Sequence, residues 1–269
     1  MLVSLLTDFG TADYFVGAMK GAILSVNEDA RIVDITHEIT PHDVHEGAWT
    51  LLAAYQTFPA RTIHVAVVDP SVGSSRRPIL ITSGNYFFVG PDNGLFSYVI
   101  ERESVCRVFH LTNDKYFRHP VSAVFHGRDL FAPVAGALLN GVEPAELGEL
   151  ITDYKRFPSL ALHKSVDGSL EARIMHIDRF GNCITNITPS DLPFDFLQRG
   201  ARLLIKEHEV HSFRRFYAEN SNIEETNPNA LFAVWGSAGF LEIAASCRSA
   251  AHLLGIERGE RVTLVSRMI

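Results

Sequence analysis

The period of the hydrophobic pattern changes once along this chain, near residue 155, and that change limits the folds open to it. Before this point, short apolar runs alternate with stretches in which apolar residues recur every three or four positions. The first run, Leu2–Leu6, is typical of a strand. The stripe that follows it is typical of an amphipathic helix and consists of Phe15, Met19, Ala22 and Val26. Alternating strands and helices predict an α/β domain with a mostly parallel sheet covered by helices.

Further elements of this first region follow from the same pattern. Thr62–Val68 is a β-branched run, the composition of a strand buried on both faces. Asp43 and Glu46 form a capping-box pattern ahead of a helical stripe, with Asp in place of Ser or Thr. The other expected strands and helices are Arg31–Ile35, Val44–Tyr55, Ile79–Thr82, Tyr86–Val89 and Leu130–Leu139.

Beyond residue 155, helical stripes become scarce and short β runs take their place. The segment 158–170 contains Pro, Ser and Lys and is weakly periodic, which is typical of a linker. The runs after it are Ala172–Ile177, Ile184–Ile187, Ala201–Lys206, Leu231–Trp235, Phe240–Ala244 and Arg261–Val265. We therefore predict an α/β domain over residues 1–157, a linker over 158–170 and a smaller all-β domain over 171–269.

Charge and composition disfavour several classes of protein. The formal net charge is 24 − 31 = −7, which argues against binding nucleic acid through its phosphates. The three cysteines are far apart and cannot close into a full set of disulfides. No apolar run approaches the ~18 residues that span a bilayer, and the first apolar run lacks a basic flank. We expect a cytoplasmic protein without a nucleic-acid or membrane partner.

Polar residues gather where predicted strands end, and ligands of open parallel sheets bind beyond those ends. Asp8 and Asp13 follow the first strand, and such a carboxylate pair suits a ribose diol or a cationic ligand. Turn formation and helix capping are the alternative for this pair. Asp69 and Arg76 lie in the loop after the Val-rich strand, where a purely structural ion pair is the alternative. His126 precedes a helix, and a structurally satisfied histidine is its alternative.

Nucleotide-binding loops and a metal site are disfavoured. No GxGxxG follows the first strand, no GxxxxGK[ST] occurs, and two carboxylates in the first turn would repel phosphate. His37, His42 and His45 form the closest histidine cluster, but neither HExxH nor a set of cysteine partners accompanies them. We expect no metal site.

Six motifs, in order across both predicted domains, resemble those of a known family. They are LLTDFGTADYFVGAMKG (Leu5–Gly21), VVDPSVGSSRR (Val67–Arg77), PDNGLF (Pro91–Phe96), FHGRD (Phe125–Asp129), IDRFGNCITNI (Ile177–Ile187) and WGSAGFLEIA (Trp235–Ala244). The family is the S-adenosylmethionine hydroxide adenosyltransferases, relatives of the fluorinase and chlorinase. The resemblance implies hydrolysis of S-adenosyl-L-methionine to adenosine and L-methionine by attack of water at the ribose C5′. It implies no cofactor, because S-adenosylmethionine is the substrate.

The resemblance also implies roles for individual residues and an assembly. The catalytic set characteristic of the water-using members corresponds to Asp69, Arg76 and His126. Substrate contacts would come from Asp8 at the ribose hydroxyls, Asp13 near the methionine end, Asp178 at the methionine ammonium, Phe180 and Asn182 at adenine, and Ser237 near the methionine carboxylate. The C-terminal domain would be barrel-like. The protein would be a homotrimer, with each active site between one N-terminal domain and the neighbour's C-terminal domain.

Three alternatives remain beside the hydrolase, one of which is a nucleoside-processing hydrolase or phosphorylase that would attack C1′ and release free adenine. A halide-using synthase of the same superfamily carries other residues at the positions of Asp69 and His126, and a carboxylate there would repel a halide at short range. A non-catalytic sensor of S-adenosylmethionine or adenosine would not need Arg76 together with those two. The chain departs from the family at Ser71, where glycine is common, and at Ala238, where the fluorinase has arginine.

Overall fold

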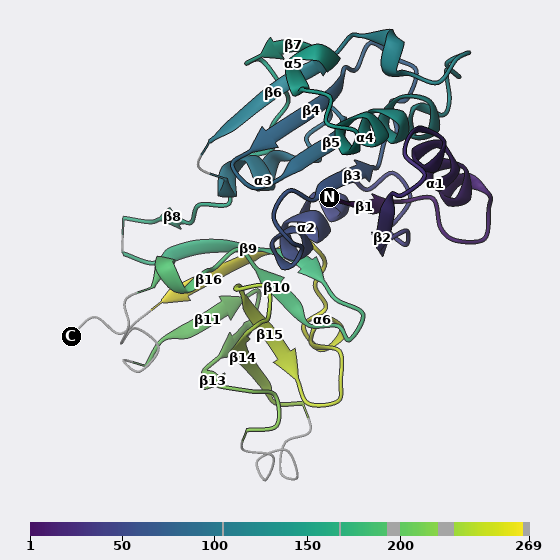
Figure 1. Ribbon diagram of the computed structural model, residues 1–269. Coiled ribbons are helices and arrows are strands. Elements are labelled where there is room, and N and C mark those ends of the chain that lie inside the picture. The colour runs from purple at the N-terminus through teal and green to yellow at the C-terminus, as the bar shows by residue number, and fades with distance from the viewer. Residues whose placement is uncertain (104, 167, 193–199, 220–228, 266–269) are drawn as a thin grey trace. The chain divides into compact units, whose positions relative to one another are not determined.

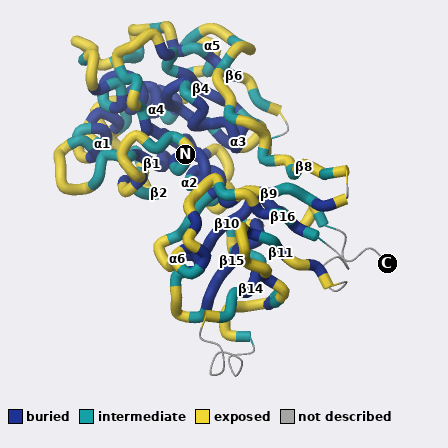
Figure 2. Tube along the Cα trace, turned by 180° about the vertical axis from the view of Figure 1, so that it is seen from behind, coloured by how far each residue is buried: buried dark blue, intermediate teal, exposed yellow. Residues whose placement is uncertain are grey.

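The computed structural model describes residues 1–103, 105–166, 168–192, 200–219 and 229–265 (Figure 1). The chain divides into two compact units, Met1–Ser159 and Leu160–Ile269. Each unit has its own sheet and its own hydrophobic core, and the buried residues concentrate on the strands of both (Figure 2).

A seven-stranded sheet forms the centre of the N-terminal unit, in the order β2-β1-β3-β5-β4-β6-β7. The first four strands in this order run parallel, which confirms the predicted mostly parallel sheet. Strand β4 runs antiparallel to both its neighbours, and β7 antiparallel to β6. The strands are β1 (Leu2–Thr7), β2 (Arg31–Thr36), β3 (Ile63–Val67), β4 (Pro78–Ser83), β5 (Phe87–Pro91), β6 (Cys106–Leu111) and β7 (Gly148–Ile151).

Helices cover both faces of this sheet (Figure 1). Ile63, Val65 and Val67 of β3 belong to the core that also contains the buried side chains of α1 and α4. His64 points to the opposite face, where its ring meets that of Tyr55 next to α2. Burial on both faces explains the continuous apolar run of β3. The helices are α1 (Phe15–Val26), α2 (Val44–Ala54), α3 (Ser97–Arg102), α4 (Ala132–Leu139) and α5 (Pro144–Leu147), with 3-10 turns η1 (Tyr55–Thr57) and η2 (Asp114–Tyr116).

Two helix starts differ from their predictions. Asp43 caps α2 by accepting a hydrogen bond from the Glu46 N–H at 3.0 Å, but the reciprocal half of the capping box is absent. Glu46 instead accepts from the Thr40 N–H at 3.1 Å, which ties down the preceding loop. The helix expected over Leu130–Leu139 begins earlier, as a π-helical turn, η3 (Gly127–Phe131), that continues into α4. Such turns are rare and frequently lie at functional sites.

The C-terminal unit is built from a curled sheet in the order β12-β11-β16-β9-β10-β15-β14-β13, with β8 added beside β9. Strands β12 and β14, far apart in this order, come into contact, so the sheet is barrel-like, as predicted. The strands are β8 (His163–Lys164), β9 (Leu170–Ile177), β10 (Cys183–Thr185), β11 (Arg202–Ile205), β12 (His208–Val210), β13 (Ser212–Arg214), β14 (Leu231–Trp235), β15 (Leu241–Ala245) and β16 (Arg261–Val265). Its described helical turns are η4 (Pro189–Asp191) and α6 (Ala250–Leu254).

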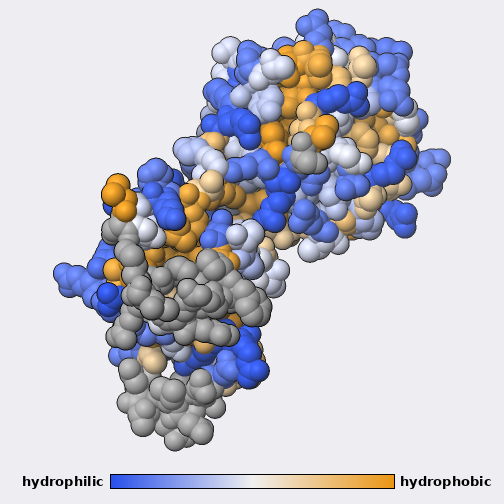
Figure 3. All heavy atoms as spheres, turned by 90° about the vertical axis from the view of Figure 1, so that its left-hand side faces the viewer, coloured by the Kyte–Doolittle hydropathy of each residue, from blue (hydrophilic) through white to orange (hydrophobic). Residues whose placement is uncertain are grey.

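The boundary between the units falls after Ser159, within the segment 158–170 that the sequence marks as a linker. Part of that segment is not loose chain, because β8 pairs antiparallel with β9. In the described chain, no helix has both the length and the apolar character needed to cross a membrane. The face drawn in Figure 3 is mostly hydrophilic, with apolar groups between the polar ones.

Candidate active site

The reversed strand β4 brings Asp69 and Arg76 together. Asp69 follows the carboxyl end of β3, and Arg76 stands just before the start of β4. Because β4 runs opposite to β3 and β5, its first residue lies at the same edge of the sheet as their last residues, and Pro78 is paired with Pro91. The loop between β3 and β4 therefore has to fold back only along one edge, where ligands of such sheets bind.

Asp69, Arg76 and His126 form one cluster, in which the first two side chains are buried and His126 is half-buried. The Arg76 Nε donates to both carboxylate oxygens of Asp69, at 3.0 and 2.9 Å, and its Nη2 donates to Oδ2 as well. The same Nη2 lies 2.8 Å from Nδ1 of His126. The side chains of Arg76 and Asp69 are only 2% and 5% exposed. The three residues predicted as a catalytic set are thus in direct contact, in an environment where charge interactions are strong.

The hydrogen bond to Arg76 fixes where His126 carries its proton. A guanidinium nitrogen can only donate, so Nδ1 of His126 accepts and the ring proton sits on Nε2. Burial lowers the pKa of His126, and the positive charge of Arg76 lowers it further. His126 is therefore a neutral imidazole near pH 7. Among the described residues, Nε2 has no hydrogen-bond partner, so its N–H is available to a ligand.

The second terminal nitrogen of Arg76, Nη1, is a further donor group at the site. This nitrogen is buried and has no hydrogen-bond partner among the described residues. The guanidinium lies 5.4 Å from the ring centroid of Phe131, which closes one side of the group. A buried N–H group without a partner is uncommon in folded proteins, and a site for an oxygen ligand is one explanation of it. The hydroxyl of Ser71 reaches Oδ1 of Asp69 at 3.4 Å, so the residue that departs from the family touches the cluster.

Asp129 of the FHGRD motif has a structural role. Its fully buried carboxylate accepts hydrogen bonds from Arg128 Nε at 2.6 Å and from the Ser122 N–H at 2.9 Å. Arg118 reaches the same carboxylate at 3.3 Å. These bonds tie the segment before η3 to the turn itself, and they hold the backbone that presents His126.

Asp8 and Asp13 are placed differently from each other. Asp8 follows β1, and its carboxylate accepts a hydrogen bond from the His42 N–H at 2.8 Å. His42 has a φ of +70°, an uncommon value for a residue other than glycine, and it lines a hollow of about 470 Å³ with Asp43 and Phe157. Asp13 is exposed in the loop before α1. Among the described residues, no hydrogen bond joins it to Asp8, and His37, His42 and His45 do not gather into a metal-ligand set.

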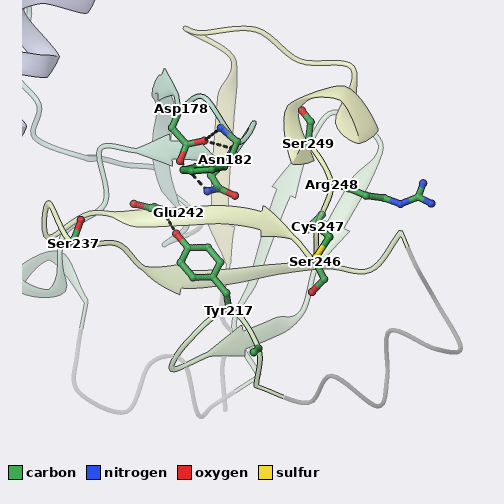
Figure 4. Close-up of a pocket in the computed structure, with 12 residues that line it drawn as sticks. Asp178, Asn182, Tyr217, Ser237, Glu242, Ser246, Cys247, Arg248 and Ser249 are labelled. Carbon is green, nitrogen blue, oxygen red and sulfur yellow. Dashed lines mark hydrogen bonds between the residues drawn. The ribbon is translucent and has the colours of Figure 1, made fainter. Parts of the chain in front are cut away.

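The C-terminal unit holds a cavity of about 730 Å³ that gathers the remaining predicted residues (Figure 4). Asp178, Phe180, Asn182 and Ser237 all line it. Phe180 is 77% exposed, an unusual position for a large aromatic ring and a suitable one for contact with a planar ligand.

The turn between β9 and β10 occupies much of the Asp178 carboxylate. Oδ1 accepts from the backbone N–H groups of Phe180 and Asn182, at 2.9 and 2.8 Å. Oδ2 accepts from the Asn182 side-chain amide at 2.9 Å. Since the amide nitrogen of Asn182 is engaged in this way, its carbonyl oxygen is the part left to accept from a ligand such as an adenine amino group.

Sequence analysis missed two residues of the cavity, Tyr217 and Glu242. Tyr217 donates a hydrogen bond of 2.6 Å to Oε2 of Glu242. Glu242 belongs to the motif WGSAGFLEIA but looks there like one polar position of a strand. The sequence did contain one clue to Glu242, because a charged residue stands between two apolar residues of a predicted strand. In the structure Leu241 and Ile243 are both fully or almost fully buried.

Comparison with known proteins shows the family of the chain. Residues 3–148 match the model of the SAM hydroxide adenosyltransferase N-terminal domain, and residues 172–263 match that of the C-terminal domain. The chain belongs to the SAM hydroxide adenosyltransferase family. A relative named (R)-S-adenosyl-L-methionine hydrolase, from Methanocaldococcus jannaschii, is 36% identical, with 98% of this chain and 95% of the relative aligned.

Two further comparisons concern a more distant relative and a solved structure. A fluorinase from Nocardia brasiliensis is a more distant relative, 25% identical over 96% of this chain and 94% of its own length. The crystal structure of an uncharacterized conserved protein from Thermotoga maritima has a TM-score of 0.86 and 30% identity. The alignment covers 98% of this chain and 99% of that one, so the two chains share their fold over nearly their whole length.

Proposed function

We infer that this family member hydrolyses S-adenosyl-L-methionine to adenosine and L-methionine. The observation that carries the proposal is the buried contact of Asp69, Arg76 and His126. The water oxygen forms a bond to C5′ while the C5′–S bond breaks, and its electron pair goes to sulfur, which leaves as the neutral thioether of methionine. One proton of the water is lost. Because a sulfonium is already a good leaving group, the reaction needs positioning of water rather than a metal or redox cofactor.

The hydrogen-bond directions divide the work on the water molecule. We assign the proton acceptor to Asp69, since a neutral His126 with its proton on Nε2 can only donate from that atom. The Nε2–H of His126 and the unpaired Nη1–H of Arg76 would direct the lone pairs of the water. Arg76 keeps Asp69 oriented through its bonds to both carboxylate oxygens.

Substitution of His126 by glutamine tests this division. The glutamine amide can donate from near the position of Nε2 but cannot act as a base, so His126→Gln should keep turnover within about tenfold of wild type. His126→Ala, which lacks the donor, should fall further. Equal loss of kcat in both variants, at an unchanged melting temperature, would move the proton acceptor to His126.

The substrate is proposed to use the remaining predicted residues. Asp8 would accept from the ribose hydroxyls, and Asp13 would lie near the methionine end. The exposed ring of Phe180 and the carbonyl oxygen of Asn182 suit adenine. Asp178 and Ser237 would hold the methionine part, in the cavity that both line.

We also propose a homotrimer with each active site shared between two chains, as the family resemblance implies. Mixing two impaired variants, assayed at substrate concentrations well below KM, tests the sharing. Asp69→Asn disables the N-terminal half of a site and Asn182→Ala weakens the C-terminal half. Unfolded and refolded together, they should regain activity above the sum of the two alone, because some sites combine two intact halves. Sedimentation velocity gives the number of chains. A monomer, or no regain of activity in mixed oligomers, would contradict the shared site.

The decisive experiment for the reaction uses ¹⁸O-labelled water. The purified protein is incubated with S-adenosylmethionine in the presence of chloride, and the products are identified by mass spectrometry. Adenosine with ¹⁸O at C5′, in equal amount to methionine, is the expected result. Chlorinated adenosine would instead assign the chain to the halide-using branch, and intact substrate bound to the protein would assign it to the sensors.

A further inference from the structure

Glu242 is a buried carboxylate in the cavity of the C-terminal unit that has no counter-charge among the described residues. The residue is only 8% exposed. Among the described residues, no Lys, Arg or His side chain pairs with it, and its one hydrogen bond comes from the neutral hydroxyl of Tyr217. Burying a carboxylate without a counter-charge is costly, so such a group commonly serves a ligand.

The surroundings of Glu242 hold its carboxylate in one position. Tyr217 binds Oε2, and the backbone carbonyl of Tyr217 accepts a hydrogen bond of 3.0 Å from Arg214. On the other side, Oε1 lies against Gly236, where an added Cβ would be 1.7 Å away. Only glycine leaves room for this carboxylate, and Oε1 has no protein donor among the described residues.

The neighbours define the chemistry of the missing partner. Ser237, next to Gly236, brings a hydroxyl donor to the same cavity, and Asp178 brings a second carboxylate (Figure 4). Burial raises the pKa of Glu242, and the negative charge of Asp178 raises it further, so both acids favour a cation between them. A ligand that suits these neighbours has a cation with N–H donors next to a group that accepts a hydrogen bond from Ser237. An α-amino acid has both, as its ammonium and its carboxylate.

We propose that Glu242, held by Tyr217, binds the α-ammonium group of the methionine part of S-adenosylmethionine. The proposal rests on the proposed function. Asp178 already accepts three hydrogen bonds within its own turn, whereas Glu242 has Oε1 free for an N–H donor. The sulfonium has no N–H or O–H to give, so hydrogen bonding to Oε1 selects the ammonium. Glu242 would therefore set the affinity for substrates with a free α-amino group.

Steady-state kinetics on Glu242→Gln tests this assignment. Glutamine keeps the size of the side chain and removes its charge. The KM for S-adenosylmethionine should rise by about 10- to 100-fold with kcat nearly unchanged, because the lost contact is the same in the ground and transition states. Tyr217→Phe should raise KM less. Glu209→Gln, at an exposed ion pair of the same unit, is the matched control and should leave KM unchanged.

An analogue of S-adenosylmethionine in which hydrogen replaces the α-amino group separates recognition from folding defects. Wild type and Glu242→Gln should process this analogue with KM values within about twofold of each other, since neither can form the charged bond. An unchanged KM for S-adenosylmethionine in a folded Glu242→Gln, or an equal rise in KM for the analogue, would overturn the proposal. Failure of the wild type to turn over S-adenosylmethionine would instead overturn the proposed function.

Discussion

In the N-terminal unit the carboxylate of Asp69 has a buried arginine as its partner, whereas in the C-terminal unit the carboxylate of Glu242 has only a tyrosine hydroxyl. In the first group, two donors lack a partner among the described residues, Arg76 Nη1 and His126 Nε2. Glu242 has no counter-charge among the residues that the structure describes. The contrast teaches that one unit is prepared to orient a small neutral molecule and the other to receive a cation. Substitutions should accordingly change kcat in the first unit and KM in the second.

The largest expected effect comes from Asp69→Asn. Loss of the proton acceptor should lower kcat by about 10²–10⁴-fold, the usual contribution of a positioned general base. Adenosine binding, followed by calorimetry, should persist. Asp29→Asn, at an exposed position after α1, is the control. Near-full turnover in a folded Asp69→Asn would contradict the proposed difference between the units, in which substitutions in the first change kcat and those in the second change KM.

Two buried groups, one in each unit, should contribute to acid stability in opposite directions. Burial lowers the pKa of His64 from its ordinary 6.5 to about 3. Between these two pH values the histidine is protonated in the unfolded chain but remains neutral in the folded chain. Stability then falls as the pH drops from about 6.5 towards about 3, by about 1.4 kcal/mol per pH unit. The raised pKa of Glu242 has the reverse sign, because protonation relieves its buried charge.

Calorimetric unfolding of His64→Asn at several pH values measures this difference. Asparagine can still meet the hydroxyl of Ser4, which now bonds Nδ1 of His64 at 2.6 Å. The variant should be less stable than wild type near neutral pH but lose less stability on acidification. If both proteins lose stability in parallel, another group controls the acid response.

A smaller effect is expected at the adenine end. Asn182→Ala removes the amide carbonyl that is proposed to accept from adenine, and it should raise KM by about 3- to 10-fold, the range for one neutral hydrogen bond. The kcat should change little. A large drop in kcat with constant KM would show that the C-terminal cavity shapes the transition state as well.

The smallest effect belongs to Ser71→Gly, which introduces the glycine that the family resemblance leads us to expect at this position. The hydroxyl of Ser71 is 3.4 Å from Asp69, a long and weak contact beside the bonds from Arg76. The kcat should stay within about threefold of wild type. A stronger effect in stopped-assay kinetics would mean that Ser71 adjusts the basicity of Asp69.

Local sequence patterns predicted a secondary-structure element correctly where a single physical principle determines that element. The stripe from Phe15 to Val26 predicted α1 at its observed bounds, because a single buried face sets its period. The strand Ile79–Thr82 was predicted, but its reversal was not, since direction depends on which neighbours it pairs with. The resemblance named Asp69, Arg76 and His126, and the structure brings them into contact.

Only some of the residues that line the cavity in the C-terminal unit could be predicted from the sequence. Asp178 and Asn182 stand in a recognisable turn, whose carboxylate and amide bond each other across four residues. Glu242 is on a strand, where alternation predicts only that it faces away from Leu241 and Ile243. Whether that second face meets solvent or a ligand cavity depends on Tyr217, 25 residues away in sequence. No local pattern contains that information.

The π-helical turn η3 also limits how the chain can change in length. A π-helical turn holds about one residue more than an α-helical turn, so deletion of one residue within Gly127–Phe131 would leave a continuous helix. The bonds of Asp129 to Arg118 and Ser122, which hold the backbone that presents His126, would be displaced by the same deletion. A shortened turn should therefore lower activity without breaking the helix, and this is a sharper constraint than surface loops place on their length.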